Sequence, residues 1–346
     1  MAIEKISAKY GKRLLDEILH HDDGVANFGG ETLFVVGERG SGKSTFLLQL
    51  AQFSRYIRKF NKAQYVSYLG RKNPPAWLPK PHPETVVFRG TKYSNWANLI
   101  PENWDDKYPF PKPVHLYLHE NDDITFYYDD EGTKIKIPNL PEIIEYDTAE
   151  DLNNLIKKYP GHIHVVYEPQ KFYLDVEFVE RFRARNLETL KFKERKKIEK
   201  MPVAPSIFWF VYFEIMLSNR PAPYITFVFD EAHQLIGNAK GEKWHLNEWF
   251  KMNAIIDARR SNVTIFFATQ QLRQIDYRLI DPVSTFVWLK SAILPGFSQF
   301  KYKNITGECY PGLGLIERRA GNYGRFEFPR TKNQKPNVLA DGVFNA

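Results

Sequence analysis

The chain has 346 residues, of which 43% are hydrophobic and 26% charged, and its formal net charge at pH 7 is +7. This composition excludes an intrinsically disordered chain, because 26 Phe, 19 Tyr and 7 Trp supply more apolar surface than a solvated coil leaves exposed. The single cysteine, Cys309, excludes an internal disulfide and a cysteine-rich metal site. We therefore expect a folded protein that either resides in a reducing compartment or does not depend on redox chemistry, and a cytoplasmic location fits both.

We also expect no secretory signal and no membrane anchor. The first 21 residues have no apolar signal-peptide core, and the longest apolar run, 207–217, is too short to cross a bilayer. Charge is unevenly placed: residues 120–151 hold eleven acids and two lysines, whereas 177–200 hold nine basic residues and five glutamates. This polarised, basic surface is a weak indication of a polyanionic partner.

The N-terminal segment, residues 1–30, predicts a short helix over 8–20 that ends in a polar turn. The apolar, β-branched run 32–36 is typical of a central parallel strand buried on both faces. Apolar residues recur at helical spacing over 44–60, so we expect a helix there, followed by a second strand over 63–69.

A proline-rich segment follows this strand. Five prolines between residues 74 and 83 exclude a helix or a central strand, so the segment should be a loop that opens an insertion. Within the insertion we expect short strands at 85–88, 114–118, 124–128 and 133–137. The acidic turn at 129–132 predicts a hairpin of the last two strands, and the alternative is a flexible acidic loop.

Regular α/β spacing resumes after residue 140. A strand over 141–146, a helix over 149–158 with Thr148 as N-cap, and a strand over 162–167 predict a βαβ unit. The further predicted elements are a basic helix (176–200), an apolar helix (205–218), a strand (224–229), an aromatic helix (246–260), two strands (263–268 and 285–290) and a closing hairpin (313–318 and 323–328).

A phosphate-binding motif lies between the first strand and the first long helix, and it matches G-x-x-x-x-G-K-[ST] in the required context. Its residues are Gly37, Glu38, Arg39, Gly40, Ser41, Gly42, Lys43, Ser44 and Thr45. Backbone N–H groups and the helix N-terminus can cradle phosphates, and the glycines permit tight bends. We expect Lys43 to contact the β- and γ-phosphates of ATP, Ser44 to hold Mg²⁺, and Thr45 to pack or contact the α-phosphate.

A second motif places two adjacent acids at the end of the apolar strand 224–229. Asp230 is expected to hold the Mg²⁺ shell, and Glu231 to orient and deprotonate the attacking water. The adjacent carboxylate distinguishes motor-type ATPases from kinases and from most GTPase switches. The two motifs together therefore predict an ATP-hydrolysing enzyme.

The strand that begins at residue 263 leads to Gln270, which should lie beside Asp230 and contact the γ-phosphate or the water. Arg259 and Arg260 precede it by eleven and ten residues. These arginines have two interpretations: they stabilise the C-terminus of the aromatic helix, or one is an arginine finger that reaches a neighbouring subunit's γ-phosphate.

The P-loop, the sequence FDEAH at 229–233 and the sequence ARRSNVTIFFATQ at 258–270 resemble the FtsK–HerA superfamily of ring-forming, DNA-pumping ATPases. The resemblance covers about 32–68 and 224–328. It implies ATP and Mg²⁺ as cofactors, a homo-oligomeric, hexameric ring, and double-stranded DNA as partner. Size and composition look most like the packaging or transfer ATPases of archaeal viruses and plasmids, which implies a capsid or membrane protein as a further partner and a host-cell cytoplasmic location.

We therefore predict an α/β chain with a RecA-like P-loop (ASCE) fold, in which helices sandwich a mainly parallel sheet, with a β-rich insertion and a C-terminal hairpin. The expected divisions are an N-terminal segment (1–30), an ATPase core (31–70 and 141–346) and the insertion (71–140). The expected function is ATP-driven translocation of double-stranded DNA. A protein-assembly ATPase that resembles zonula-occludens-toxin-like proteins is the alternative, and Glu231 and Gln270 disfavour a small-molecule phosphotransferase.

Other features keep two interpretations or are excluded. Two histidine pairs, His115 with His119 and His162 with His164, could bind a metal but more commonly serve in hydrogen bonds. Basic residues between 181 and 197 could line a DNA channel or form a solvated helix face. A DEAH-box helicase is excluded, because too few residues follow Gln270 for a second RecA-like domain.

Overall fold

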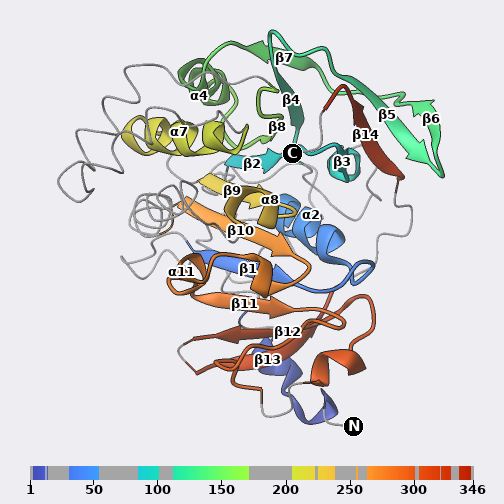
Figure 1. The fold of residues 1–346 in the computed structure, drawn as a ribbon, viewed down its shortest axis with the longest axis vertical. Helices are drawn as coiled ribbons and strands as arrows, with labels where there is room; N and C mark the ends of the chain where they lie inside the picture. The colour runs from blue at the N-terminus through green and yellow to red at the C-terminus, as the bar shows by residue number, and fades with distance from the viewer. Residues whose placement is uncertain are drawn as a thin grey trace, which may run out of the picture.

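The computed structural model forms two sheets with helices packed beside them (Figure 1). The residues that it describes are 3–11, 14, 31–53, 85–100, 112–170, 205–222, 225–237, 255, 263–300, 304–319, 321–328 and 335–343.

Within these residues, the main sheet contains ten strands in the order β13-β12-β11-β1-β10-β9-β2-β8-β4-β7. In chain order these are β1 (Thr32–Val36), β2 (Thr85–Arg89), β4 (Val114–His119), β7 (Ile143–Tyr146), β8 (Ile163–Val166), β9 (Ile225–Phe229), β10 (Val263–Thr269), β11 (Thr285–Trp288), β12 (Leu313–Arg318) and β13 (Tyr323–Glu327). Neighbouring strands are parallel except that β12 runs antiparallel to both β11 and β13. The predicted parallel sheet and C-terminal hairpin are confirmed.

The centre of this sheet brings the two sequence motifs to one edge. β10 lies between β1, which leads into the P-loop, and β9, which leads into the acidic pair. The three strands are parallel, with Val36 beside Thr269 and Phe267 beside Phe229, so their carboxyl ends lie together. A single strand, β10, thus separates the P-loop strand from the acidic strand. This is the arrangement expected of the predicted fold class, and the fold class is confirmed.

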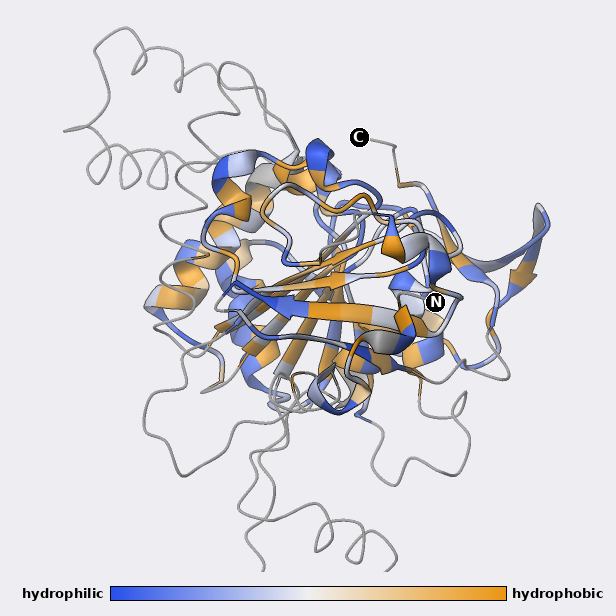
Figure 2. Ribbon diagram, turned by 90° about the horizontal axis from the view of Figure 1, so that it is seen from below, coloured by the Kyte–Doolittle hydropathy of each residue, from blue (hydrophilic) through white to orange (hydrophobic). Residues whose placement is uncertain are grey.

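Helices cover both faces of the main sheet. The helices are α2 (Lys43–Phe53), α4 (Ala149–Lys157), α7 (Pro205–Ser218), α8 (His233–Ile236) and α11 (Tyr277–Ile280), with 3-10 turns η1 (Ile3–Lys5), η2 (Trp96–Leu99), η5 (Leu272–Gln274) and η6 (Ile305–Glu308). Leu33 and Val35 of β1 belong to the same hydrophobic cluster as Phe46 of α2. Phe34 points the other way and shares a cluster with Phe213 of α7. This alternation makes β1 buried on both sides, and Figure 2 shows the hydrophobic residues concentrated in the strands between the layers.

The second sheet has the order β3-β14-β5-β6, with β3 (Tyr93–Ser94), β5 (Thr125–Asp130), β6 (Thr133–Lys136) and β14 (Asn337–Asp341). β5 and β6 form an antiparallel hairpin whose turn residues, Glu131 and Gly132, have φ of +50° and +89°. The hairpin interpretation of the acidic stretch is confirmed. β14 was not predicted; it joins β3 to β5 and ties the C-terminal part of the chain to the middle of the sequence.

The structure differs from the sequence prediction in where the strands of residues 71–140 belong. β2 and β4 lie within that range, yet both are strands of the main sheet, and β2 is fully buried at the side of β9. Among the described residues of this range, only β3, β5 and β6 form the smaller sheet with β14. A short apolar run is compatible with either sheet, because pairing with distant strands, rather than local pattern, decides its place.

The βαβ unit forms around an additional strand. α4 begins at the predicted N-cap, where Thr148 Oγ1 accepts a hydrogen bond of 3.0 Å from Asp151 N. β7 and β8 are parallel, as predicted, but β4 lies between them. The expected strand 63–69, the basic helix 176–200, nearly all of the aromatic helix 246–260 and most of the helix 8–20 lie outside the described residues.

Candidate active site

The P-loop connects β1 to α2 where the central parallel strands end. Gly40 and Gly42 have φ of +77° and +93°, a conformation that strains any residue with a Cβ. A Cβ on Gly42 would also lie 3.2 Å from Phe328 Cζ. Phe46 N donates to Gly42 O at 2.8 Å, so helical hydrogen bonding begins inside the motif. The loop thus presents the N-terminus of α2 toward the site, which favours an anion.

The Lys43 amine lies inside the loop, and the side chain is almost fully buried. Its Nζ donates to Gly37 O at 2.9 Å and to Glu38 O at 3.0 Å. Burial lowers the pKa of Lys43, while the negative charges of Asp230, Glu231 and Glu38 act in the opposite direction. A phosphate would offer this amine stronger, charged acceptors than the two carbonyls do.

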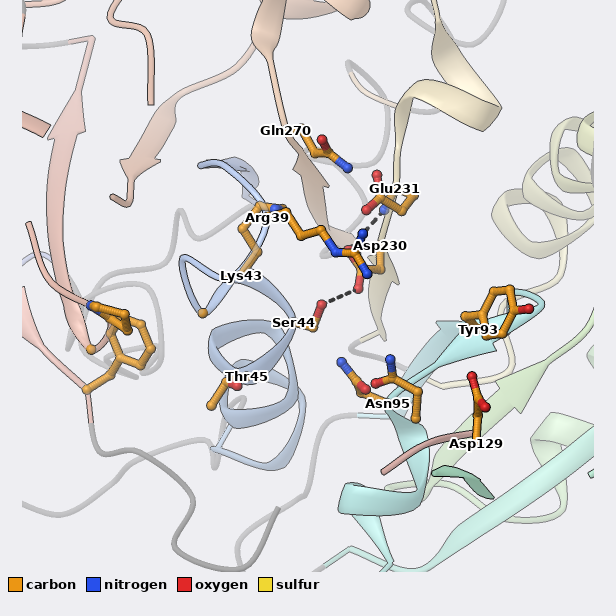
Figure 3. Close-up of a pocket in the computed structure, with 16 residues that line it drawn as sticks. Arg39, Lys43, Ser44, Thr45, Tyr93, Asn95, Asp129, Asp230, Glu231 and Gln270 are labelled. Carbon is orange, nitrogen blue, oxygen red and sulfur yellow. Dashed lines mark hydrogen bonds between the residues drawn. The ribbon is translucent and has the colours of Figure 1, made fainter. Parts of the chain in front are cut away.

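Ser44 and Asp230 meet across the site although 186 residues separate them in sequence. Ser44 Oγ donates to Asp230 Oδ2 at 2.7 Å (Figure 3). Hydroxyl and carboxylate oxygens are the ligands that Mg²⁺ prefers, and neighbouring ligands of an octahedral Mg²⁺ lie about 3 Å apart. The pair that the sequence assigned to the metal therefore has the chemistry and the spacing to hold it.

Glu231 follows Asp230 in a left-handed backbone conformation, with φ of +51°. Its N–H donates to Asp230 Oδ1 at 3.0 Å, which ties the two acids into one turn. Its side chain is 31% exposed, and Oε2 lies 3.3 Å from His233 Nδ1. A carboxylate at the cavity wall, beside the metal ligand but with a different polar neighbour, fits the expected role of a general base.

One cavity of about 830 Å³ contains the residues expected to bind the nucleotide, the metal and the water. The P-loop contributes Arg39, Gly40, Gly42, Lys43, Ser44 and Thr45, and the strand ends contribute Asp230, Glu231 and Gln270. Figure 3 shows the Arg39 side chain extended through the cavity toward Asp230, with Gln270 on the same side as Glu231. The sequence prediction had assigned these nine residues to the site, and the structure brings them together.

The remaining P-loop residues face elsewhere. Gly37 and Glu38 bind Lys43 through their backbone oxygens, and the Glu38 carboxylate lies 3.6 Å from Lys290 Nζ. Ser41 is fully buried under the loop, and its Oγ has no hydrogen-bond partner among the described residues. These three residues shape the loop. Arg259 and Arg260 lie outside the described residues, so their roles remain a prediction.

The cavity has walls that the motifs did not indicate. Tyr93, Asn95, Asp129 and Asn337 reach it from the second sheet and the residues beside it, and Pro311, Gly312 and Phe328 from the C-terminal hairpin region. Figure 3 places Asn95 between Ser44 and Tyr93, close to the metal pair. Tyr93, Asn95, Asp129 and Asn337 belong to no recognisable motif, and the pairing of β14 with β3 and β5 brings their segments together.

The histidines that the sequence left with two interpretations form hydrogen bonds. His115 Nε2 and His162 Nδ1 are 2.7 Å apart, and their rings stack. His164 lies behind them, bonded to the Tyr117 hydroxyl at 3.0 Å and to the Tyr159 carbonyl at 3.1 Å. Burial lowers the pKa of all three. His119 instead packs edge-on against a tyrosine ring of β7.

Comparison with known proteins gives matches in structure alone. No protein-family model matches the chain, and no curated protein matches it in sequence. The genome packaging NTPase B204 from Sulfolobus turreted icosahedral virus 2, in complex with ATP-gammaS, is similar over 86% of this chain and 97% of its own, with 9% identity and a TM-score of 0.36. The cytoplasmic domain of the type VII secretion ATPase EccC from Thermomonospora curvata is similar over 88% of this chain and 26% of its own, with 15% identity and a TM-score of 0.34.

A third similar structure is the N-terminal domain of zonular occludens toxin from Neisseria meningitidis, over 87% of this chain and 96% of its own, with 10% identity and a TM-score of 0.27. The similar structures thus include a genome packaging NTPase, which is the class of protein that the sequence resembles, and a zonular occludens toxin domain, which is the class given as the alternative. Within the part of the chain that the structure describes, no helix has the length and apolarity to cross a bilayer.

Proposed function

We propose that this protein is an ATP hydrolase that uses Mg²⁺. The P-loop and Lys43 hold the phosphates, and Ser44 with Asp230 holds the metal. When bound, Mg²⁺ neutralises charge on the β- and γ-phosphates. Glu231 takes the proton of the attacking water, and Gln270 orients the water or the γ-phosphate from the neighbouring strand.

The observation that carries this proposal is the 2.7 Å contact between Ser44 Oγ and Asp230 Oδ2. It joins the P-loop to the acidic strand across a strand that lies between them. The contact places Glu231, the next residue, at the wall of the same cavity as Lys43. A glycine-rich turn without a phosphate-binding role would not be expected to place its serine against a distant aspartate that is followed by a second carboxylate.

We further propose that the enzyme is a homo-oligomeric ring, a hexamer, that translocates double-stranded DNA, with Arg259 or Arg260 as the finger in trans. The sequence resemblance supports this proposal, and the net charge of +7 suits a polyanionic partner. A viral genome-packaging or plasmid-transfer task in the host cytoplasm, with a capsid or membrane protein as docking partner, is part of the same proposal. The alternative is a protein-assembly ATPase that does not move DNA.

DNA-stimulated turnover separates these functions. The ATP hydrolysis rate is measured with and without linear duplex DNA at low and at moderate salt, with Lys43→Ala as the inactive control. A DNA motor should turn over ATP faster with DNA, and less so at moderate salt, because phosphate contacts weaken as counterions are added. Hydrolysis without any response to DNA would favour the assembly ATPase, and equal turnover by Lys43→Ala and the parent would remove the ATPase assignment.

A further inference from the structure

A histidine two residues after the proposed catalytic base contacts its carboxylate. His233 Nδ1 lies 3.3 Å from Glu231 Oε2, and the two side chains are 30% and 31% exposed. We propose that His233 is a positioning residue that holds one oxygen of Glu231 and so aims the other at the attacking water. This inference rests on the proposed ATP hydrolysis, for which Glu231 is the base.

The backbone around Glu231 is fixed by other bonds, whereas its carboxylate is not. Ala232 N donates to Ala268 O at 2.7 Å, and Gln234 N donates to Glu231 O at 2.9 Å. Within the described part of the chain, Glu231 Oε2 and His233 Nδ1 are both buried atoms that meet no other hydrogen-bonding group. Each is therefore the polar neighbour available to the other, at a distance that a small side-chain rotation closes to a hydrogen bond.

His233 approaches Glu231 from the side away from the nucleotide. Glu231 and Gln270 line both the main cavity and a second cavity of about 400 Å³, whereas His233 lines only the second. Arg89 and Gln234 also line the second cavity. Arg89 Nη1 donates to Gln234 Oε1 at 3.4 Å, a contact that helps to hold α8 in place. His233 thus reaches the reacting groups through Glu231 and has no contact with the phosphate site itself.

The contact with His233 restricts the orientation of the Glu231 carboxylate, which the flexible glutamate side chain does not fix by itself. A glutamate has three rotatable side-chain bonds, and a general base must hold its oxygen within about 2.6–3.2 Å of the proton that it takes. A ring that donates from Nδ1 binds one carboxylate oxygen and leaves the second free to accept the proton. Misplacing such a group by about 1 Å can cost about 100-fold in rate.

The experiment compares the parent with His233→Ala and His233→Asn, and uses His119→Ala as a matched control on β4, far from Glu231 in the strand order. ATP affinity, the melting temperature, kcat and KM are measured for each. We expect kcat of His233→Ala to fall about 10- to 100-fold, with KM, ATP affinity and melting temperature close to the parent's. Asparagine can donate from a similar position, so His233→Asn should recover a large part of kcat, and His119→Ala should match the parent.

A second arm tests whether the effect passes through Glu231. In a Glu231→Gln background the base is absent, so adding His233→Ala should lower the residual rate by less than about twofold. Unchanged or raised kcat in His233→Ala would overturn the positioning role, as would a loss that asparagine does not relieve. Absence of hydrolysis by the parent itself would instead overturn the proposed function, which distinguishes the two failures.

Discussion

The Lys43 amine shows how one residue can be placed by the loop before a ligand arrives. Its two acceptors are backbone carbonyls of the same loop, at 2.9 and 3.0 Å. The neighbouring carboxylates favour the charged amine, while burial opposes it. Phosphate oxygens in place of the carbonyls would offset the cost of that burial.

At this scale we predict that Lys43→Ala abolishes ATP hydrolysis and weakens nucleotide binding, with little change in stability. The two lost bonds from a charged amine are worth about 1.5–3 kcal/mol each. The substitution also removes the cost of burying that charge, so the two effects largely cancel. Calorimetric titration with an ATP analogue and thermal unfolding measure the two effects. Parent-like binding together with a large loss of stability would make Lys43 a structural residue.

The sequence alone predicts the cavity residues that belong to the two motifs. It does not predict the residues that line the cavity from the second sheet. Lys43, Ser44 and Asp230 belong to patterns whose local geometry is fixed by a strand, a tight loop and a helix. Asn95 and Asp129 reach the same cavity because β14 pairs with β3 and β5. Such pairing between segments about 200 residues apart leaves no periodic signal in either segment.

At the level of elements, a buried ion pair links the end of β2, the segment just after β8 and α7. Arg89 donates through Nε to Glu168 Oε2 at 2.7 Å and through a second nitrogen to Oε1, and Trp209 Nε1 also donates to this carboxylate. Arg89 and Glu168 are both buried. The pair therefore fastens the end of a central strand to the helix layer that covers it.

We predict that Arg89→Ala destabilises the protein by about 3–5 kcal/mol, because it leaves the Glu168 charge buried without its main partner. The double variant Arg89→Met, Glu168→Gln should lose less than the single one. Denaturant unfolding gives both values, and Lys134→Ala, which removes an exposed ion pair with Asp341, is the control with a much smaller expected change. A loss in Arg89→Ala no larger than in the control would contradict the role of the pair.

The histidine cluster between β4 and β8 makes stability depend on pH. Burial lowers the pKa of His164 to about 3, below the value of about 6.5 expected in the unfolded chain. The unfolded chain therefore binds more protons in this range, and the free energy of unfolding should fall as pH falls from about 6.5 toward 3. Above pH 7, His164 is neutral in both the folded and the unfolded chain, so its full contribution to the free energy of unfolding is present.

Urea unfolding at pH 7.5, 6.5 and 5.5 tests this dependence. We predict that His164→Gln lowers stability at pH 7.5, where the bonds to Tyr117 and Tyr159 are lost or altered, and flattens the decline toward pH 5.5. A parent and a variant with parallel pH profiles would show that His164 does not supply the dependence.

Strands inside residues 71–140 show which part of the architecture is visible in sequence. The runs that form β2 and β4 were located correctly as strands, because their apolar pattern and their flanking turns are local properties. Their membership in the main sheet does not follow from these local properties, because it depends on pairing with β8 and β9. Element existence thus follows from pattern, while sheet membership follows from packing.

At the scale of the whole molecule, the ring proposal depends on a residue supplied by a neighbour. An arginine given in trans can accelerate γ-phosphate cleavage by about 10³–10⁵. We predict that mixing inactive Lys43→Ala subunits with inactive Arg259→Ala subunits restores hydrolysis, because some intact P-loops then face an intact Arg259. The same mixture with Arg260→Ala decides between the two arginines.

Recovery should depend on the mixing ratio and be greatest near equal amounts. No recovery at any ratio, with either arginine variant, would contradict an arginine finger in trans and would favour an ATPase that works without a ring interface. Recovery with one variant only would assign the finger to that residue.

Single-turnover hydrolysis by Glu231→Gln tests whether the Ser44–Asp230 pair and Glu231 form one hydrolytic site. The amide cannot take a proton from water, so this variant should bind ATP with Mg²⁺ as tightly as the parent and retain it uncleaved. The parent should release phosphate from the same amount of bound ATP. Cleavage at the parent's rate, or loss of nucleotide binding together with turnover, would contradict the assignment of Glu231 as the base.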